Sequence, residues 1–114
     1  MNATKLMIGD WVLDRKKPAQ ITGIICDDFF ETTLSPSVGG EYISPIPLTP
    51  EILEQNGFER VNGDYQDVFY VYDGVELLID DVYTLFGQCK MQIMYVHELQ
   101  HALKLCRIEK DIEI

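Results

Sequence analysis

The sequence predicts a small α+β protein: an N-terminal SH3-like β-barrel or sheet, followed by a helix, a β-meander and a C-terminal amphipathic helix. Three observations predict this class. Short β-branched segments separated by turn residues fill residues 1–45, two Asx-Gly dipeptides punctuate residues 58–79, and a helical apolar period occupies residues 95–107. The 114 residues are 46% hydrophobic, which suffices for a core. We expect one compact domain over 1–114, with subregions 1–45 and 46–114.

Closely spaced short strands are expected in the first subregion. The turn pair Gly9-Asp10 leads into a strand that ends near Leu13, and a polar turn over residues 14–18 follows. Further strands are expected over residues 21–26, 29–33 and 41–44, with a loop over 35–40. Short strands at this spacing favour a strongly bent, SH3-like β unit.

A short helix is expected over residues 50–56. Thr49 is a good N-cap, Pro50 suits the first helical position, and Glu51 favours the positive end of the helix dipole. Gly57 is expected as the C′ residue, where glycine tolerates a left-handed backbone. The helix therefore has both a start and a stop signal.

Two hairpins and two further strands are expected after this helix. Asn62-Gly63 and Asp73-Gly74 both tolerate the positive φ angles of a type I′ turn, and a strand is expected to begin near Tyr65. A two-residue loop at 73–74 pairs Tyr72 with Val75, Tyr70 with Leu77 and Val68 with Ile79. Residues 83–86 and 91–94 are expected to form strands around a turn at Gly87.

The last helix is expected over residues 95–107. Its apolar residues recur at steps of three and four; they are Val96, Leu99, Ala102, Leu103 and Cys106. Lys104, Arg107 and Lys110 cluster toward its end, where cations complement the negative pole of the helix dipole.

This helix contains a literal H-E-x-x-H match, His97-Glu98-Leu99-Gln100-His101. Two His side chains one helical turn apart can share a zinc ion, and the Glu can take a proton from zinc-bound water. A minimal zinc metallohydrolase using His97, Glu98 and His101 is therefore an alternative function. Adventitious zinc or nickel binding by the two His side chains is a further possibility.

Two features of the sequence oppose that alternative. A catalytic zinc needs a third protein ligand, yet Lys104 and Arg107 occupy the positions of the metzincin continuation, and only 13 residues follow His101. We expect that tail, with Glu109 and Glu113, to lack the room to fold back in a defined way. On a helical wheel, His97 and His101 lie about 160° from Leu99, on the expected solvent face. We predict no catalytic, metal-binding or cofactor-binding residue and no cofactor.

Composition limits the partners and the compartment. The formal charge is −10, from 19 acids and 9 bases, which disfavours nucleic acid and anionic membrane as partners. The first ten residues show no signal-peptide pattern, and no stretch approaches the roughly 20 apolar residues of a membrane span. We expect a cytoplasmic protein whose three cysteines, Cys26, Cys89 and Cys106, are small buried hydrophobes.

The remaining clusters of candidate functional residues have simple structural explanations. Asp27-Asp28 and Asp80-Asp81 could bind a hard cation but lack loop-site spacing, and Gly39-Gly40 precedes no helix that would bind phosphate. The Arg15-Lys16-Lys17 run is expected as a solvated turn. The aromatic set could stack on bases, but packing in the core and hairpins is favoured; its members are Trp11, Tyr65, Tyr70, Tyr72, Tyr83 and Tyr95.

Four segments in this order resemble a group of small proteins from Bacteroidetes genomes, often in phage-like or mobile regions. The segments are MIGDWV (7–12), PIPLTPEIL (45–53), NGF (56–58) and YVHELQ (95–100). The group has no assigned activity, so the resemblance implies no site residues. It implies that Val-His-x-Leu-Gln is the recurring part of the last helix, which makes the full H-E-x-x-H a by-product of a structural helix.

These observations favour a non-catalytic protein-interaction or accessory domain of phage or mobile-element origin, with a protein partner. The zinc metallohydrolase is the first alternative. An acidic DNA mimic, or an inhibitor of a basic partner, is the second, because the charge of −10 could dock on a basic protein.

Overall fold

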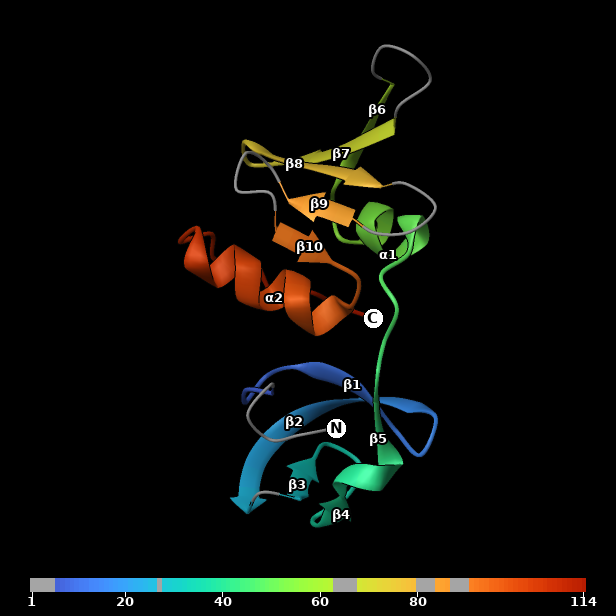
Figure 1. Cartoon of the computed structure of the whole chain (residues 1–114), viewed down its shortest axis with the longest axis vertical. Helices are drawn as coiled ribbons and strands as arrows, with labels where there is room; N and C mark the ends of the chain where they lie inside the picture. The colour runs from blue at the N-terminus through green and yellow to red at the C-terminus, as the bar shows by residue number, and fades with distance from the viewer. Residues whose placement is uncertain (1–5, 27, 63–67, 80–83, 87–90) are drawn as a thin grey trace. The chain divides into compact units, whose positions relative to one another are not determined.

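The computed structural model describes residues 6–26, 28–62, 68–79, 84–86 and 91–114 (Figure 1). The chain divides into two compact units. Unit 1 comprises Met1–Pro47 and Tyr95–His97, and unit 2 comprises Leu48–Met94 and Glu98–Ile114. The main boundary lies close to the predicted division after residue 45. The α+β class is confirmed, whereas one domain over 1–114 stays a prediction.

Unit 1 contains a five-stranded antiparallel sheet. Its strands are β1 (Trp11–Asp14), β2 (Lys17–Cys26), β3 (Phe29–Thr32), β4 (Val38–Gly39) and β5 (Ile43–Pro45), with the 3-10 helix η2 (Gly40–Tyr42) before β5. The order β4-β3-β2-β1-β5 leaves β4 and β5 as separate edges, so the sheet is not closed into a barrel. The loop expected over 35–40 is corrected, because buried Val38 joins the core as part of a strand. The other members of that core are Leu6, Val12, Ile21, Phe30 and Ile43.

The turn before β1 is built as the sequence predicts. Gly9 has φ +96°, which suits glycine, and the Met7 amide donates to the buried Asp10 carboxylate at 2.7 Å. The next turn is tighter than predicted. Arg15 and Lys16 alone form it, both with positive φ, and Pro18 already lies in β2 opposite Leu13.

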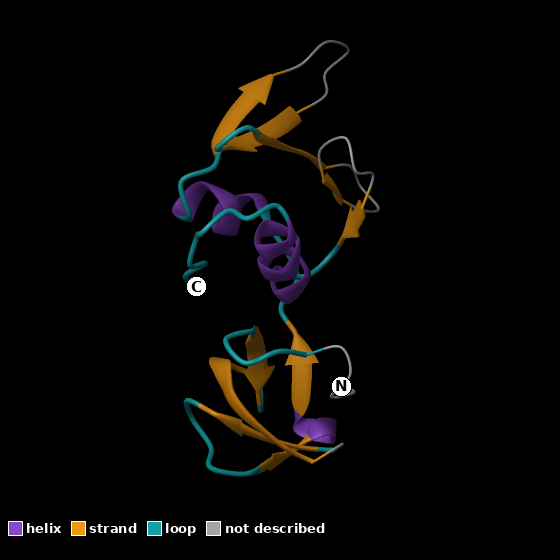
Figure 2. Cartoon of the chain, turned by 90° about the vertical axis from the view of Figure 1, so that its left-hand side faces the viewer, coloured by secondary structure: helices purple, strands orange, loops and turns teal. Residues whose placement is uncertain are grey.

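Unit 2 contains two helices and a second five-stranded antiparallel sheet. The helices are α1 (Pro50–Gln55) and α2 (Val96–Leu105), of which residues 96 and 97 belong to unit 1. The strands, which follow one another as neighbours, are β6 (Glu59–Asn62), β7 (Val68–Tyr72), β8 (Val75–Ile79), β9 (Thr84–Phe86) and β10 (Met91–Ile93). Figure 2 shows both helices on the same side of this curved sheet. The predicted helix, β-meander and final helix are confirmed.

The β7–β8 hairpin has the predicted turn and register. Asp73 and Gly74 have φ values of 48° and 81°, and Tyr72 pairs with Val75. The predicted pair of Tyr70 and Leu77 is also present, and both side chains are buried. The turns at Gly63 and Gly87 and the strand start near Tyr65 lie outside the described residues.

Helix α1 begins and ends as predicted. The Thr49 hydroxyl accepts a hydrogen bond from the Ile52 amide at 3.3 Å, and Gly57 has φ +87°. The Phe58 amide donates to the Leu53 carbonyl at 3.0 Å, which completes a Schellman motif. Helix α2 ends in the same motif, with Arg107 at φ +58° in the position that Gly57 holds in α1.

The C-terminal segment docks on α1, contrary to prediction. Ile112 is buried, and the side chain of Asn56 hydrogen-bonds both backbone groups of Glu113. One amide side chain can hold an extended segment in this way because it carries a donor and an acceptor side by side. The expectation that the tail lacks room to fold back is therefore wrong. No helix of the described chain is both long and apolar enough to span a bilayer.

Candidate functional site

The H-E-x-x-H segment lies at the start of α2, where the chain leaves an extended stretch. Tyr95 forms an isolated β-bridge with Pro47, and the Val96 amide donates to the Ile46 carbonyl at 2.9 Å. The first backbone donor of the helix is thus satisfied by another segment of unit 1.

Glu98 caps the N-terminus of this helix. Its carboxylate oxygen Oε1 accepts a hydrogen bond from the Met94 amide at 3.0 Å. A carboxylate in the first turn also interacts favourably with the positive end of the helix dipole. This contact gives the Glu of the motif a structural role.

His97 is buried, so the prediction that it faces solvent is wrong. Its side chain is 5% exposed, and its ring stacks on that of Tyr95 with 5.9 Å between centroids and 7° between planes. The helical wheel predicted the wrong environment for His97 because it considers only the apolar residues of the helix itself. The residue just before the helix supplies a second apolar surface. His101, one turn later, is half-buried rather than fully exposed.

The described residues contain no group of three or more His, Cys, Asp and Glu side chains arranged to hold a metal ion. Lys104 and Arg107, at the positions of the metzincin continuation, are both exposed. Among the contacts of the motif, the His97 ring stacks on Tyr95 and the Glu98 carboxylate accepts from the Met94 amide.

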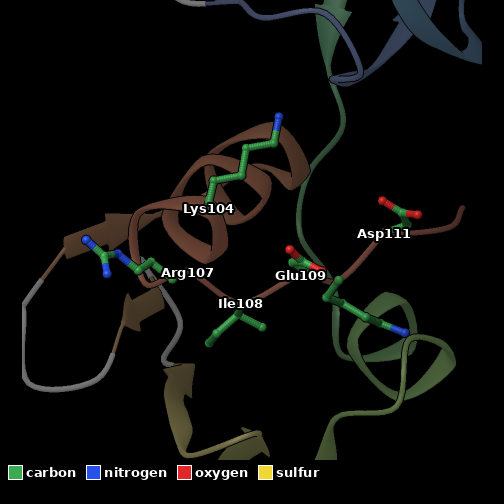
Figure 3. A pocket seen from close by; sticks show the side chains of 6 residues that line it. Lys104, Arg107, Ile108, Glu109 and Asp111 are labelled. Atoms are coloured by element: carbon green, nitrogen blue, oxygen red, sulfur yellow. The ribbon is translucent and has the colours of Figure 1, made fainter.

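A hollow of about 800 Å³ lies at the end of α2 (Figure 3). Its lining residues are Lys104, Arg107, Ile108, Glu109, Lys110 and Asp111. The side chains of Lys104 and Arg107 point in different directions in Figure 3, and the Lys110 ammonium lies 5.5 Å from the centre of the Tyr72 ring. These cations do not converge on one position for an anion.

Two of the three cysteines differ from prediction. Cys26 and Cys106 are exposed rather than buried, because Cys26 ends β2 beyond the core and Cys106 follows the last residue of α2. Cys89 lies outside the described residues, as do Asp27, Asp80, Asp81, Tyr65 and Tyr83.

The other expected turn and aromatic residues are accounted for within the fold. The Arg15 guanidinium lies 5.6 Å from the centre of the Tyr42 ring, so this basic turn packs on η2. Tyr70 is buried, and Tyr72 packs on Phe58 with 5.2 Å between ring centroids. The described tyrosines of unit 2 thus serve packing, as expected.

Sequence reasoning missed an exposed aromatic surface on β3. The strand alternates exposed and buried residues, with Phe30 inside and Phe29, 47% exposed, on the outer face. Phe29 pairs with Gly39 of β4, and Glu31 lies on the same face two residues further along. In a strand, the sequence Phe-Phe-Glu-Thr predicts that one phenylalanine ring faces the core and the other faces solvent. It does not predict which of the two rings is exposed.

Glu41 completes this surface. A point one bond out from Gly39, where a Cβ would sit, lies 3.6 Å from a Glu41 carboxylate oxygen and 3.9 Å from the Phe29 ring. We name Phe29, Glu31, Gly39 and Glu41 the Phe29 face. It presents one aromatic ring with two carboxylates on the outside of the sheet.

Comparison of the chain with protein-family models, curated proteins and solved structures finds no match.

Proposed function

We propose that the protein is a non-catalytic binding or accessory domain that acts by contacting another protein. The supporting observation is a concentration of exposed apolar side chains in unit 1. Seven of the ten large hydrophobic residues exposed in the described chain belong to it: Met7, Ile8, Ile24, Ile25, Phe29, Leu34 and Tyr42. Single exposed apolar residues are ordinary, whereas apolar side chains that lie together mark contact surfaces, and Ile25 lies beside the pair of Cys26 and Phe29 at the end of β2.

The proposal includes an SH3-like character for unit 1. Its support is the antiparallel meander from β1 to β4, followed by η2 and by β5 alongside β1. A small curved sheet of this kind presents side chains on one outer face while the other face covers the core. Origin in a phage or mobile element and a cytoplasmic location are also part of the proposal, supported by the segment order and the composition.

Capture of the partner tests this function. The immobilised protein and its Ile25→Ser, Phe29→Ser double variant are compared in lysate of the source cells. The captured protein is then purified and titrated calorimetrically. A saturable complex with a defined stoichiometry, weakened in the double variant, supports the proposal. Leu105→Ser is the matched control, since Leu105 is 75% exposed but lies in unit 2.

Two other results contradict it. Stoichiometric zinc in tag-free protein, with a peptidase activity that Glu98→Gln abolishes, establishes the metallohydrolase instead. Association with a nucleic-acid-binding protein that DNA competes away, and that salt weakens steeply, establishes the DNA mimic.

A further inference from the structure

We propose that the Phe29 face binds a basic segment of the partner protein, with a lysine or arginine side chain lying on the Phe29 ring between Glu31 and Glu41. This inference rests on the proposed function and names its surface and its ligand chemistry. An aromatic face attracts a cation through the ring quadrupole, and a carboxylate beside it adds a charge-assisted hydrogen bond.

The acids around the ring form no ion pair within the described residues. Glu31 accepts a hydrogen bond from the Thr22 hydroxyl at 2.9 Å, and neither Glu31 nor Glu41 forms an ion pair within the described residues. Asp28, next to Phe29, is also exposed. Asp28 and Glu31 thus keep a negative potential beside the Phe29 ring, which favours a positively charged partner.

The cations of the described part of unit 1 are clustered at one turn. In the described part of the unit, the lysine and arginine residues are Arg15, Lys16 and Lys17, all at the β1–β2 turn. That turn is at the start of the ten-residue strand β2, whereas Cys26, at its end, pairs with Phe29. Arg15 of this turn packs on Tyr42, next to Glu41, whereas Phe29 and Glu31 pair with the second half of β2, so the β3 side of the face is the side away from the basic turn.

Gly39 supports close approach of a partner at this face. Its φ and ψ of −70° and 146° are ordinary extended values that any residue adopts. A Cβ there would make only ordinary contacts, at 3.6 Å and 3.9 Å, so the fold itself does not require glycine. Because glycine has no side chain, this position leaves the neighbouring Phe29 ring and Glu41 carboxylate uncovered on that side.

The end of the β2–β3 hairpin adds apolar area to the contact. Ile25 is exposed and lies at the bulge of β2 beside the pair of Cys26 and Phe29, whereas Ile24 pairs with the inward-facing Phe30. A segment that combines arginine or lysine with aliphatic residues would complement both properties. Nucleic acid and anionic lipid would instead meet repulsion from the carboxylates and from a chain charge of −10.

The probe for this site is a labelled twelve-residue peptide of alternating arginine and leucine, with a glutamate–leucine peptide as its matched control. Both are titrated into the full chain by fluorescence anisotropy and by amide-resolved NMR. We expect saturable binding of the arginine peptide alone. The largest shifts should fall on residues 28–31 and 39–41, and affinity should drop as salt is raised.

Matched variants separate this face from general attraction to an acidic protein. Phe29→Ser and the Glu31→Lys, Glu41→Lys double variant should each weaken binding about tenfold. Leu105→Ser and Glu59→Lys change an exposed apolar residue and an exposed acid of unit 2, and they should leave the affinity within about twofold. Circular dichroism of every variant confirms that the fold is retained.

Each remaining outcome overturns the inference. If the NMR shifts centre on unit 2, or if the control variants lose as much affinity, the basic peptide binds at another surface. If no saturable binding is found, the protein does not recognise a basic segment. Concentration-dependent dimerisation that Phe29→Ser abolishes assigns the face to a second copy of the chain. If the natural partner is captured but is insensitive to Phe29→Ser, this inference fails and the proposed function stands. If no protein partner exists, the proposed function itself fails.

Discussion

Asn56 holds the backbone of Glu113 with both ends of its side-chain amide. Its Oδ1 accepts from the Glu113 amide at 2.7 Å, and its Nδ2 donates to the Glu113 carbonyl at 2.8 Å. The same Nδ2 donates to the Ile52 carbonyl at 2.7 Å, within α1. One buried side chain thereby joins the end of a helix to the backbone of a residue 57 positions away.

Asn56→Ala should lower the free energy of unfolding by about 2–3 kcal/mol, because partly buried backbone groups lose their partners. Asn56→Asp keeps the acceptor for the Glu113 amide but sets a buried carboxylate oxygen against the Ile52 and Glu113 carbonyls, so its loss should be at least as large. Urea denaturation measures both, and hydrogen exchange should show faster exchange at residues 112–114. Equal midpoints for wild type and Asn56→Ala would refute the role of this contact.

The two Schellman motifs predict stability changes of opposite sign. Arg107→Gly should stabilise the protein by about 1 kcal/mol, because a left-handed backbone is costly for any residue with a Cβ. Gly57→Ala should destabilise it by about 1 kcal/mol for the same reason. Thermal unfolding of the two variants measures the pair, and shifts in the same direction would contradict the explanation.

Thr32→Val should be strongly destabilising although the two side chains have nearly the same shape. The Thr32 hydroxyl donates to the buried Asp14 carboxylate at 2.7 Å and accepts from the Leu34 and Ser35 amides. Asp14 Oδ1 has no hydrogen-bond partner in the described chain, so the variant leaves this carboxylate without any described hydrogen bond. We expect a loss of about 2–4 kcal/mol in chemical denaturation. Thr22→Val, at an exposed hydroxyl, should change stability by less than about 0.5 kcal/mol.

The stability of two Glu98 variants tests whether this side chain has a structural role. Glu98→Ala should destabilise the protein by about 1 kcal/mol through loss of the contact with the Met94 amide. Glu98→Gln retains an acceptor oxygen and should keep most of that stability. Guanidinium denaturation compares the two variants with Glu54→Ala, an exposed position of α1. A Gln variant as unstable as the Ala variant would argue against the cap.

Local signals in the sequence predicted the elements whose geometry depends on neighbouring residues. Gly57 stopped α1 because glycine fits the left-handed C′ position, and Asp73-Gly74 set the β7–β8 register because both residues accept positive φ. Arg15, Lys16 and Arg107 adopt the same backbone region without being residues that favour it. Their tertiary surroundings, rather than their own propensities, hold them there.

Contacts between distant segments were not predictable in this way. The burial of His97 depends on the residue before the helix, and the docking of the C-terminal segment depends on Asn56. The Phe29 face is assembled from β3, β4 and η2, so no single segment carries its signal. Periodicity correctly placed α2, but it described only one face of that helix.

The exposed thiols of Cys26 and Cys106 make the chain suited to paired spin labelling. One thiol belongs to unit 1 and the other to unit 2. With Cys89 replaced by serine, nitroxides at these two positions would report the separation of the units directly, in solution and without introducing new cysteines. Because Cys26 pairs with Phe29, the first label would also sense a peptide arriving beside it.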